Sequence, residues 1–193
     1  MSSSRYQMVL GLVLLVTAVS SVHGGSCPSP SPAKGYTDKA YYGLWYEIGK
    51  IQTAGGAYFE KDCVCTTINV KPKKGANNGD ATAVNSCRKL KPNGDFLNAT
   101  GSLTNEGPKG KWKEGFFWFT PKVDYTIIEL GPDFAVEFDC GSTFGLVNYC
   151  IHILSRTPTQ NKTLTTTLLK KAINMGLNVD NLDFKQTLQD GCW

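Results

Sequence analysis

Eight short runs of apolar and β-branched residues follow one another between positions 43 and 155, and this succession is the strongest constraint on the fold. Turn signals separate the runs, among them Asn93-Gly94, which favours a tight hairpin. An eight-strand antiparallel meander hides its edges most easily by closing into a barrel. The predicted strands cover residues 43–51, 63–70, 81–90, 96–104, 112–119, 125–130, 134–140 and 146–155.

One helix is expected after the last strand. Apolar side chains recur along one stripe from Thr163 to Met175, and Gly176 stands where a helix ends in a left-handed turn. Thr165-Thr166-Thr167 is a poor helix former, so packing on the barrel must stabilise the helix. The tail over 179–188 leaves room for one short strand. The predicted fold is all-β: an eight-stranded antiparallel up-and-down β-barrel with one C-terminal α-helix packed on the outside.

The first 24 residues have the composition of a secretory signal peptide. Arg5 precedes an apolar run from Met8 to Val19, which is too short to cross a bilayer of about 30 Å. We expect cleavage after Gly24 or Gly25, a single domain over residues 25–193, and a secreted, extracellular product. No later segment is long and apolar enough to predict a membrane span.

The charge distribution indicates a solvated surface. The chain has 20 basic and 16 acidic residues, a formal charge of +4, and no basic run longer than Lys73-Lys74 or Lys170-Lys171. A nucleic-acid footprint requires clustered basic residues. We therefore expect no nucleic-acid partner.

Seven cysteines lie in the expected secreted part, where an oxidising compartment favours disulfides. An odd number leaves at least one thiol free or paired between molecules, which permits a homodimer without implying one. A zinc site needs four ligands, but Cys63-Val64-Cys65 has no second close pair and His152 is the one histidine after the signal peptide. No metal site is predicted. Two sequons predict glycosylation at Asn98 and Asn161.

Two distant motifs carry a family resemblance. Gly43-Leu44-Trp45-Tyr46-Glu47-Ile48 near the start and His152-Ile153-Leu154-Ser155-Arg156-Thr157-Pro158 after the last strand together resemble the lipocalin family. Cys27-Pro28-Ser29-Pro30, with Cys140 and Cys192, is similar to the apolipoprotein D-like branch. That branch includes insect bilin-binding proteins and crustacean carotenoid-binding subunits.

The resemblance implies a structural plug made by Gly43, Trp45 and Arg156. The first and last strands of a closed barrel are neighbours, so Arg156 is expected to lie across the Trp45 ring. Such a contact contributes about 0.5 to 2 kcal/mol and excludes water from the narrow end.

The resemblance also implies disulfides Cys27–Cys140 and Cys63–Cys192. Cys65 and Cys87 lie on adjacent strands, and alternation would give Cys63 and Cys65 the same face. A Cys65–Cys87 bond is our hypothesis on that basis.

Cys150 is then left over, and three interpretations stay open. It is a small buried hydrophobe, a lumen thiol that bonds a chromophore, or a catalytic nucleophile as in the prostaglandin-isomerising branch of the family. His152 shares its face by alternation. Because nothing in the sequence supplies the positive, partly open setting that a thiolate needs, we expect no enzyme and no catalytic residue.

An eight-stranded barrel has room for about one small ligand. The expected function is binding and transport of a small hydrophobic ligand (lipid, sterol, retinoid, carotenoid or bilin), with no required cofactor. A pigment-binding chromoprotein holding biliverdin or a carotenoid, an enzyme using Cys150 and a barrel filled by its own side chains are the alternatives. The candidate lumen residues are Tyr46, Tyr58, Phe59, Phe96, Phe116, Trp118, Tyr125, Cys150 and His152.

Overall fold

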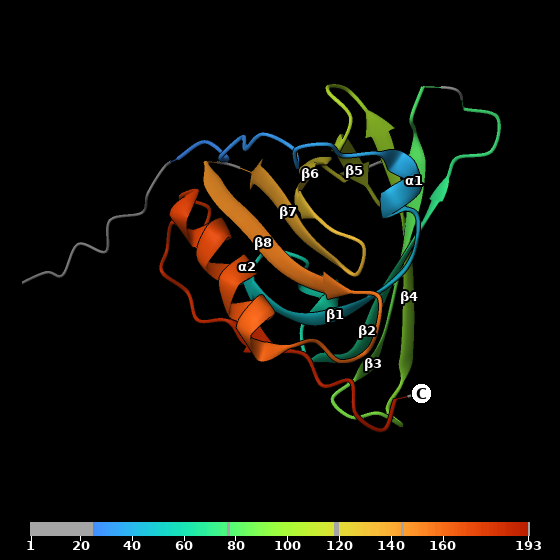
Figure 1. Ribbon diagram of the computed structural model, residues 1–193, viewed down its shortest axis with the longest axis vertical. Helices are drawn as coiled ribbons and strands as arrows, with labels where there is room; N and C mark the ends of the chain where they lie inside the picture. The colour runs from blue at the N-terminus through green and yellow to red at the C-terminus, as the bar shows by residue number, and fades with distance from the viewer. Residues whose placement is uncertain (1–24, 77, 118–119, 144, 193) are drawn as a thin grey trace, which may run out of the picture.

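The computed structural model describes residues 25–76, 78–117, 120–143 and 145–192, so the expected signal peptide over 1–24 and Trp118 lie outside the described residues. Eight strands follow the predicted meander, and β1 pairs with both β8 and β2, which closes the barrel (Figure 1). The predicted fold class is confirmed. The strands are β1 Gly43–Gln52, β2 Cys63–Pro72, β3 Ala81–Lys89, β4 Phe96–Asn105, β5 Lys111–Gly115, β6 Val123–Leu130, β7 Phe134–Thr143 and β8 Leu146–Ser155.

Four short or outer elements complete the described part of the chain. Helix α1 (Asp38–Tyr41) precedes β1, and a 3-10 turn, η1 (Tyr58–Glu60), lies between β1 and β2. Helix α2 (Lys162–Asn174) packs outside the barrel, and β9 (Lys185–Gln186) pairs with β1. Among the described residues, neither helix α1 nor helix α2 has the length and apolar character needed to cross a membrane.

Strand β5 is shorter than predicted. The sequence predicted strand through 112–119, but the chain leaves the sheet after Gly115. The Thr120 hydroxyl donates a 2.9 Å hydrogen bond to the carbonyl of Phe117, and Pro121 follows with no N–H to donate to a ladder. Phe116, Phe117, Thr120 and Pro121 therefore lie beyond the ladder, where they line a cavity.

Helix α2 begins one residue earlier than predicted because Asn161 caps it. The Asn161 side chain accepts hydrogen bonds from the backbone N–H groups of Thr163 (2.8 Å) and Leu164 (3.3 Å). Leu168 and Ala172 are buried against the outward-facing side chains of the barrel wall. Tertiary packing on this face compensates for the weak helix propensity of the threonines.

The barrel has one core inside and another outside. The inner cluster includes Trp45, Trp112 and Tyr125, and the outer cluster, under α2, includes Phe138 and Ile151. Along β7 and β8 the outward positions are therefore apolar, and the alternate inward positions are free to be polar.

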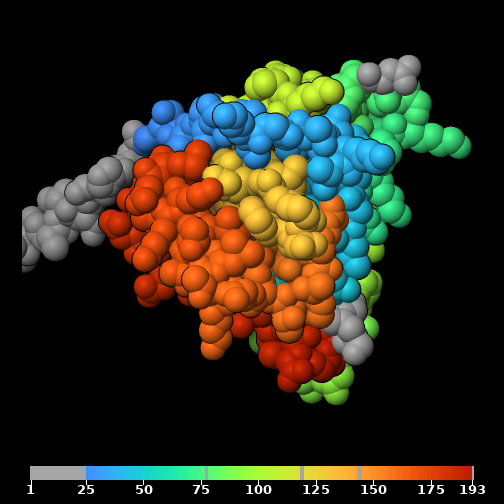
Figure 2. All heavy atoms as spheres, in the orientation of Figure 1, coloured from blue at the N-terminus to red at the C-terminus, as the bar shows by residue number. Residues whose placement is uncertain are grey.

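The N-terminal arm covers the closed end of the barrel. Figure 2 shows it in blue, lying across the molecule above β7 and β8. Ala33 donates its N–H to the carbonyl of Ile127 at 2.8 Å, and Tyr36 is buried in the inner cluster. Gly110 has a positive φ of 91°, and a Cβ there would lie 3.0 Å from the Cβ of Pro32, so a side chain would crowd the arm.

The plug has the predicted form. The Arg156 guanidinium lies 3.4 Å from the centroid of the Trp45 ring and donates to the carbonyls of Leu44 (2.8 Å) and Ala40 (2.7 Å). Gly43 has φ 106°, and a Cβ there would lie 3.3 Å from the guanidinium. The glycine therefore gives Arg156 its access to the backbone around the first strand.

Of the three expected disulfides, Cys27–Cys140 is confirmed, and the other two exchange partners. The structure pairs Cys63 with Cys87 and Cys65 with Cys192, so both Cys63–Cys192 and Cys65–Cys87 are wrong. The predicted alternation fails because β2 is bulged.

The bulge inserts one extra residue into β2. Val64 pairs with Arg88 but Thr67 with Ser86, so two residues of β2 oppose one of β3. Cys65, with φ 55°, donates its N–H to the carbonyl of Leu188 in the C-terminal tail at 2.8 Å. Cys65 therefore forms its disulfide with Cys192 in the tail, and Cys63 forms its disulfide with Cys87 on the neighbouring strand.

Candidate ligand-binding site

The barrel interior holds two adjoining cavities of about 230 and 390 Å³, which we call the polar and the apolar chamber. Phe59 and Phe116, whose ring centroids are 4.9 Å apart, line both chambers. The polar chamber is lined chiefly by Glu60, Asn85, Glu114, Glu137, Asp139 and His152. The apolar chamber is lined by Phe59, Cys87, Leu97, Ala99, Phe116 and Phe117, with Asn85 and Ser86 among its polar residues.

Strand alternation brings the polar residues together. Glu137 on β7 pairs with His152 on β8, and Asp139 pairs with Cys150. Their neighbours Phe138 and Ile151 face the outer core under α2. Because successive side chains in a strand point to opposite faces, these four residues all point into the barrel.

A second bulge brings a lysine to the same side. The β1 register shifts between Glu47 and Gly49, so Lys50, three residues after Glu47, faces the interior with it. The Lys50 ammonium lies 3.4 Å from the Glu47 carboxylate and 3.0 Å from that of Glu60. Burial alone would lower the pKa of Lys50, but Glu47 and Glu60 raise it above its ordinary value.

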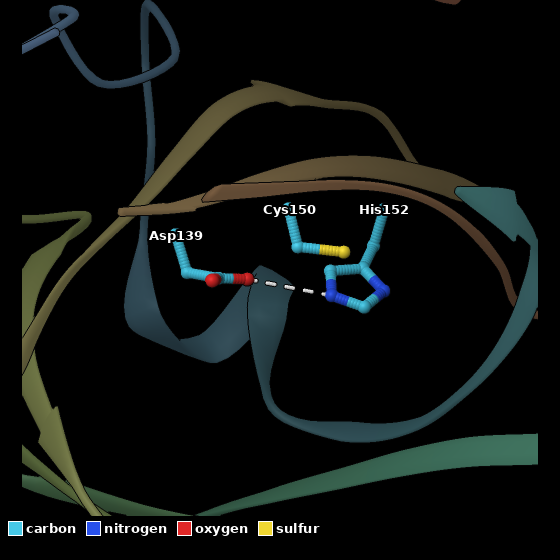
Figure 3. Close-up of side chains that lie close together, drawn as sticks. All are labelled: Asp139, Cys150 and His152. Atoms are coloured by element: carbon cyan, nitrogen blue, oxygen red, sulfur yellow. Dashed lines mark ion pairs between the residues drawn. The ribbon is translucent and has the colours of Figure 1, made fainter. Parts of the chain in front are cut away.

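His152 lies between two carboxylates. Its Nδ1 is 2.6 Å from a Glu47 oxygen, and its Nε2 is 3.4 Å from an Asp139 oxygen (Figure 3). Burial opposes a charged ring, but the carboxylates of Asp139 and Glu47 raise the pKa of His152 above its ordinary value. Because a carboxylate oxygen faces each ring nitrogen, the geometry favours the imidazolium, which has an N–H on both nitrogens.

Glu47 joins the lumen to the C-terminal tail. One carboxylate oxygen faces His152 and Lys50, and the other accepts a hydrogen bond from the Thr187 hydroxyl. Although burial opposes ionisation, Lys50 and His152 lower the pKa of the Glu47 carboxyl to about 2. Gln189 donates to the Glu47 carbonyl at 2.9 Å, which fixes the tail over the same point of the wall.

Two tyrosines bind Glu137 at the floor of the polar chamber. The Tyr125 hydroxyl donates to it at 2.8 Å and the Tyr41 hydroxyl at 3.3 Å. Burial raises the pKa of the Glu137 carboxyl to about 7, against the lowering influence of His152. The charge on this carboxyl therefore changes near neutral pH.

Glu114 differs from the other carboxyls of the chamber. Its side chain is only 6% exposed, and its Oε1 atom is buried with no hydrogen-bond partner among the described residues. Burial, and after it the charges of Glu137 and Asp139, raise the pKa of Glu114 well above its ordinary value. A buried carboxyl without partners is costly, so its presence on the chamber wall requires an explanation.

Cys150 is a free, fully buried thiol beside His152 (Figure 3). Burial raises the pKa of Cys150 to about 12 even though the His152 charge opposes this. A thiol that holds its proton at neutral pH is not a nucleophile. This geometry agrees with the interpretation of Cys150 as a small buried hydrophobe.

Two groups of residues in the described part of the chain come close enough to hold a metal: Asp139 with Cys150 and His152, and Glu47 with Glu60 and His152. The first contains the protonated thiol, and both contain the imidazolium. In the second, the Lys50 ammonium already lies against Glu47 and Glu60. Metal ligands must be deprotonated, so a metal would have to displace protons from these groups or the Lys50 ammonium before it could bind.

Four of the candidate lumen residues line the chambers: Tyr58, Phe59, Phe116 and His152. Tyr125 lies deeper, in the inner cluster, and reaches the polar chamber through Glu137. Cys150 lies beside that chamber without lining it. Trp118 is outside the described residues.

Phe96 and Tyr46 were wrongly expected in the lumen. Phe96 is 56% exposed, and the Arg88 guanidinium lies over its ring at 5.0 Å. Tyr46 is half-buried, alternates with the inward Trp45 and lines neither chamber. On both strands the neighbouring position faces inward, so the ring faces outward.

Sequence patterns did not point to the carboxyl groups of the polar chamber and its wall: Glu47, Glu60, Glu114, Glu137 and Asp139. Alternation in β7 does separate Glu137 and Asp139 from Val136 and Phe138. That pattern is usually taken to put the apolar face inside. Here α2 buries the apolar face from the outside, so the polar face is the interior one.

A family model for the lipocalin-like domain matches residues 38–187, and the chain therefore belongs to the lipocalin-like family. Apolipoprotein D of Macaca fascicularis is 27% identical over 197 residues, covering 94% of this chain and 96% of that protein. Apolipoprotein D of Rattus norvegicus is 30% identical over 144 residues, covering 72% and 70%.

Solved structures with the same fold include insecticyanin from the tobacco hornworm Manduca sexta, with a TM-score of 0.62 at 19% identity over 84% of this chain and 86% of that one. Lobster apocrustacyanin A1 has a TM-score of 0.59 at 14% identity over 79% of each chain. At these identities the structural likeness supports the fold alone.

Proposed function

We propose that this protein is a secreted carrier that binds a small hydrophobic ligand in the barrel lumen. The observation that carries the proposal is the apolar chamber of about 390 Å³, which opens beside the polar chamber inside a closed barrel. Burying about 300 Å² of apolar ligand surface contributes roughly 7 kcal/mol before ordering costs. Membership of the lipocalin-like family supports the same function.

Secretion rests on the composition of residues 1–24 and on the three disulfides, which fit an oxidising compartment. Asn98 and Asn161 are both exposed, which suits the predicted glycosylation. Mass spectrometry of the protein recovered from the medium of secreting cells tests both. We expect an N-terminus after Gly24 or Gly25 and a mass that falls on treatment with an N-glycosidase.

The binding proposal is tested by filling the apolar chamber. Ala99 on β4 lines it, and Ala99→Trp keeps the surrounding sequon intact. We expect this change to weaken retinol binding, measured by quenching of tryptophan fluorescence, at least about tenfold. Ser102→Trp on the same strand lies on the opposite face from buried Leu103 and serves as the control. Equal retinol affinities for the two variants would contradict binding in the lumen.

A pigment is the first alternative ligand, because the resemblance extends to bilin- and carotenoid-binding members of the family. That no such group is required by the protein stays a prediction. An absorption spectrum of the protein purified from its natural source decides this point. A visible band would identify a pigment carrier.

Catalysis by Cys150 is the second alternative, and the buried, protonated thiol disfavours it. Cys150→Ser should leave retinol affinity unchanged. If the protein turns over a substrate and this variant loses that turnover, the carrier proposal is reversed.

A further inference from the structure

Carboxyl groups outnumber cationic side chains in the polar chamber and its wall. Five carboxyl groups meet there with two cationic side chains: Glu47, Glu60, Glu114, Glu137 and Asp139 against Lys50 and His152. Lys50 lies between Glu47 and Glu60, and His152 lies between Glu47 and Asp139. Both protein cations are therefore fully engaged by three of the five carboxyls.

The remaining two carboxyls, Glu137 and Glu114, differ in what binds them. Glu137 accepts hydrogen bonds from Tyr41 and Tyr125. Glu114 is more than nine-tenths buried, and its Oε1 has no partner among the described residues. The Glu114 side chain lines the polar chamber, so a ligand head group there can supply the partner that the described residues do not.

The wall around Glu114 is shaped to hold its carboxyl in place. A Cβ added at Gly101 on β4 would lie 2.3 Å from the Glu114 Oε1 atom. The carboxyl thus lies directly on the backbone of β4, at a position that only glycine leaves open. Glu114 itself comes from β5, between the closed-end ring of Trp112 and the Phe116 ring at the boundary of the two chambers.

The apolar chamber continues from this point. Phe116 and Phe59 line both chambers, and Leu97 and Ala99 line the far one. A ligand that fills both chambers must therefore have a polar head and an apolar body. A carboxylate head would be repelled by the carboxylates of Glu60 and Asp139, whereas a protonated amine would be attracted and is bound favourably near aromatic rings.

We propose that the lumen selects amphiphiles with a protonated amine head, whose ammonium donates to Glu114 while the hydrocarbon body lies in the apolar chamber. This inference rests on the proposed carrier function and specifies its ligand class. Burial and the neighbouring carboxylates raise the pKa of Glu114, so an ammonium bound beside this carboxyl favours its ionised form, and any proton it holds goes to solvent. Binding of the amine therefore releases a proton that binding of a neutral ligand does not.

The test compares octylamine, 1-octanol and octanoate, which share a hydrocarbon chain and differ in the head. Each is used to displace retinol from the protein at pH 7. We expect octylamine to bind at least about tenfold more tightly than 1-octanol, and octanoate to bind most weakly. Calorimetry of octylamine binding in phosphate and in Tris, whose ionisation enthalpies differ, is expected to show proton release.

Glu114→Gln removes the carboxylate without changing the shape of the side chain. We expect it to abolish the amine preference and the proton release while 1-octanol affinity changes less than about twofold. Glu106→Gln, an equal change of charge on an exposed loop residue, is the matched control and should keep both. If Glu114→Gln fails to fold, the ranking of octylamine above 1-octanol and octanoate on the unaltered protein still decides the proposal.

The outcomes separate this inference from the carrier function. If retinol and 1-octanol bind but octylamine binds no more tightly than 1-octanol, the proposed preference for a cationic head group is overturned. The same holds if the preference for the amine survives in Glu114→Gln. In both cases the proposed carrier function is unaffected. If neither retinol nor any of the three ligands binds, the carrier function itself fails.

Discussion

At the scale of single residues, Glu47 is the group on which the most interactions converge. It binds His152 and Lys50 inside the barrel and Thr187 in the tail, and it is fully buried. Removing one partner of a buried ionic network leaves uncompensated charge, which is more costly than the net value of the network.

We therefore predict that Glu47→Gln lowers the free energy of unfolding by about 3 to 5 kcal/mol. Glu129→Gln is the matched control, because Glu129 pairs at 3.1 Å with a half-exposed Lys171 on the surface of α2. Exposed pairs contribute less than about 1 kcal/mol. Urea unfolding of both variants measures the difference, and equal losses would contradict the assigned role of Glu47.

The free energy of unfolding depends on pH through the Glu137 carboxyl. Its pKa in the folded protein is about 7, above the ordinary value of 4.5, so the folded state holds this proton more tightly than the unfolded state does. Its stabilising contribution is complete below pH 4.5 and is lost as the pH rises through 7. The neighbouring titratable groups are Tyr41, Tyr125, His152, Asp139, Glu114 and Glu60.

We predict that Glu137→Gln becomes more stable relative to the unaltered protein as the pH rises from 4.5 to 8. A raised pKa of this size corresponds to a relative change of up to about 3 kcal/mol. Chemical unfolding at four or five pH values measures it. Parallel stability curves for the two proteins would show that Glu137 does not titrate as described.

At the scale of elements, the bulges in β1 and β2 decide which side chains enter the lumen and which hold the tail. The β2 bulge sends Cys65 to the tail and leaves Cys63 to the neighbouring strand. The β1 bulge brings Lys50 to the same side as Glu47. At each bulge the alternation of side chains is interrupted, and a residue beside the bulge contacts the C-terminal tail: Cys65 bonds Cys192, and Glu47 binds Thr187.

The disulfide exchange predicts a specific new thiol. In Cys192→Ser, the partner left free should be Cys65 and not Cys63. Alkylation after unfolding without reductant, followed by fragmentation between the two cysteines, identifies it. The unaltered protein should show a single modified residue, Cys150. Label on Cys63 would support the Cys63–Cys192 pairing that the family resemblance implied.

The sequence predicted the meander, the closure and the plug because these depend on strand order and on two well-separated motifs. It did not predict the bulges, since a single inserted residue such as Cys65 leaves no mark in composition or periodicity. The wrong lumen position of Phe96 has a different origin: rings were assumed to face inward, and here Arg88 covers the ring on the outside.

At the scale of the whole molecule, the buried apolar side chains form two separate cores, one inside the barrel and one outside it. The N-terminal arm, the plug and the inner rings close one end, and α2 buries the outer faces of β7 and β8. Because the outer core supplies apolar burial, the interior can accommodate buried carboxylates that a simple core could not. The lumen is therefore available for a ligand while the fold is stabilised elsewhere.

The central claim, that the ligand occupies the lumen, is tested most directly by methyl NMR during titration with 1-octanol. We predict large shifts for the methyl groups of Leu97 and Ala99, which line the apolar chamber, and none for those of Leu168 and Ala172 in the outer core. Shifts confined to Leu168 and Ala172 would place the ligand outside the barrel and contradict the account.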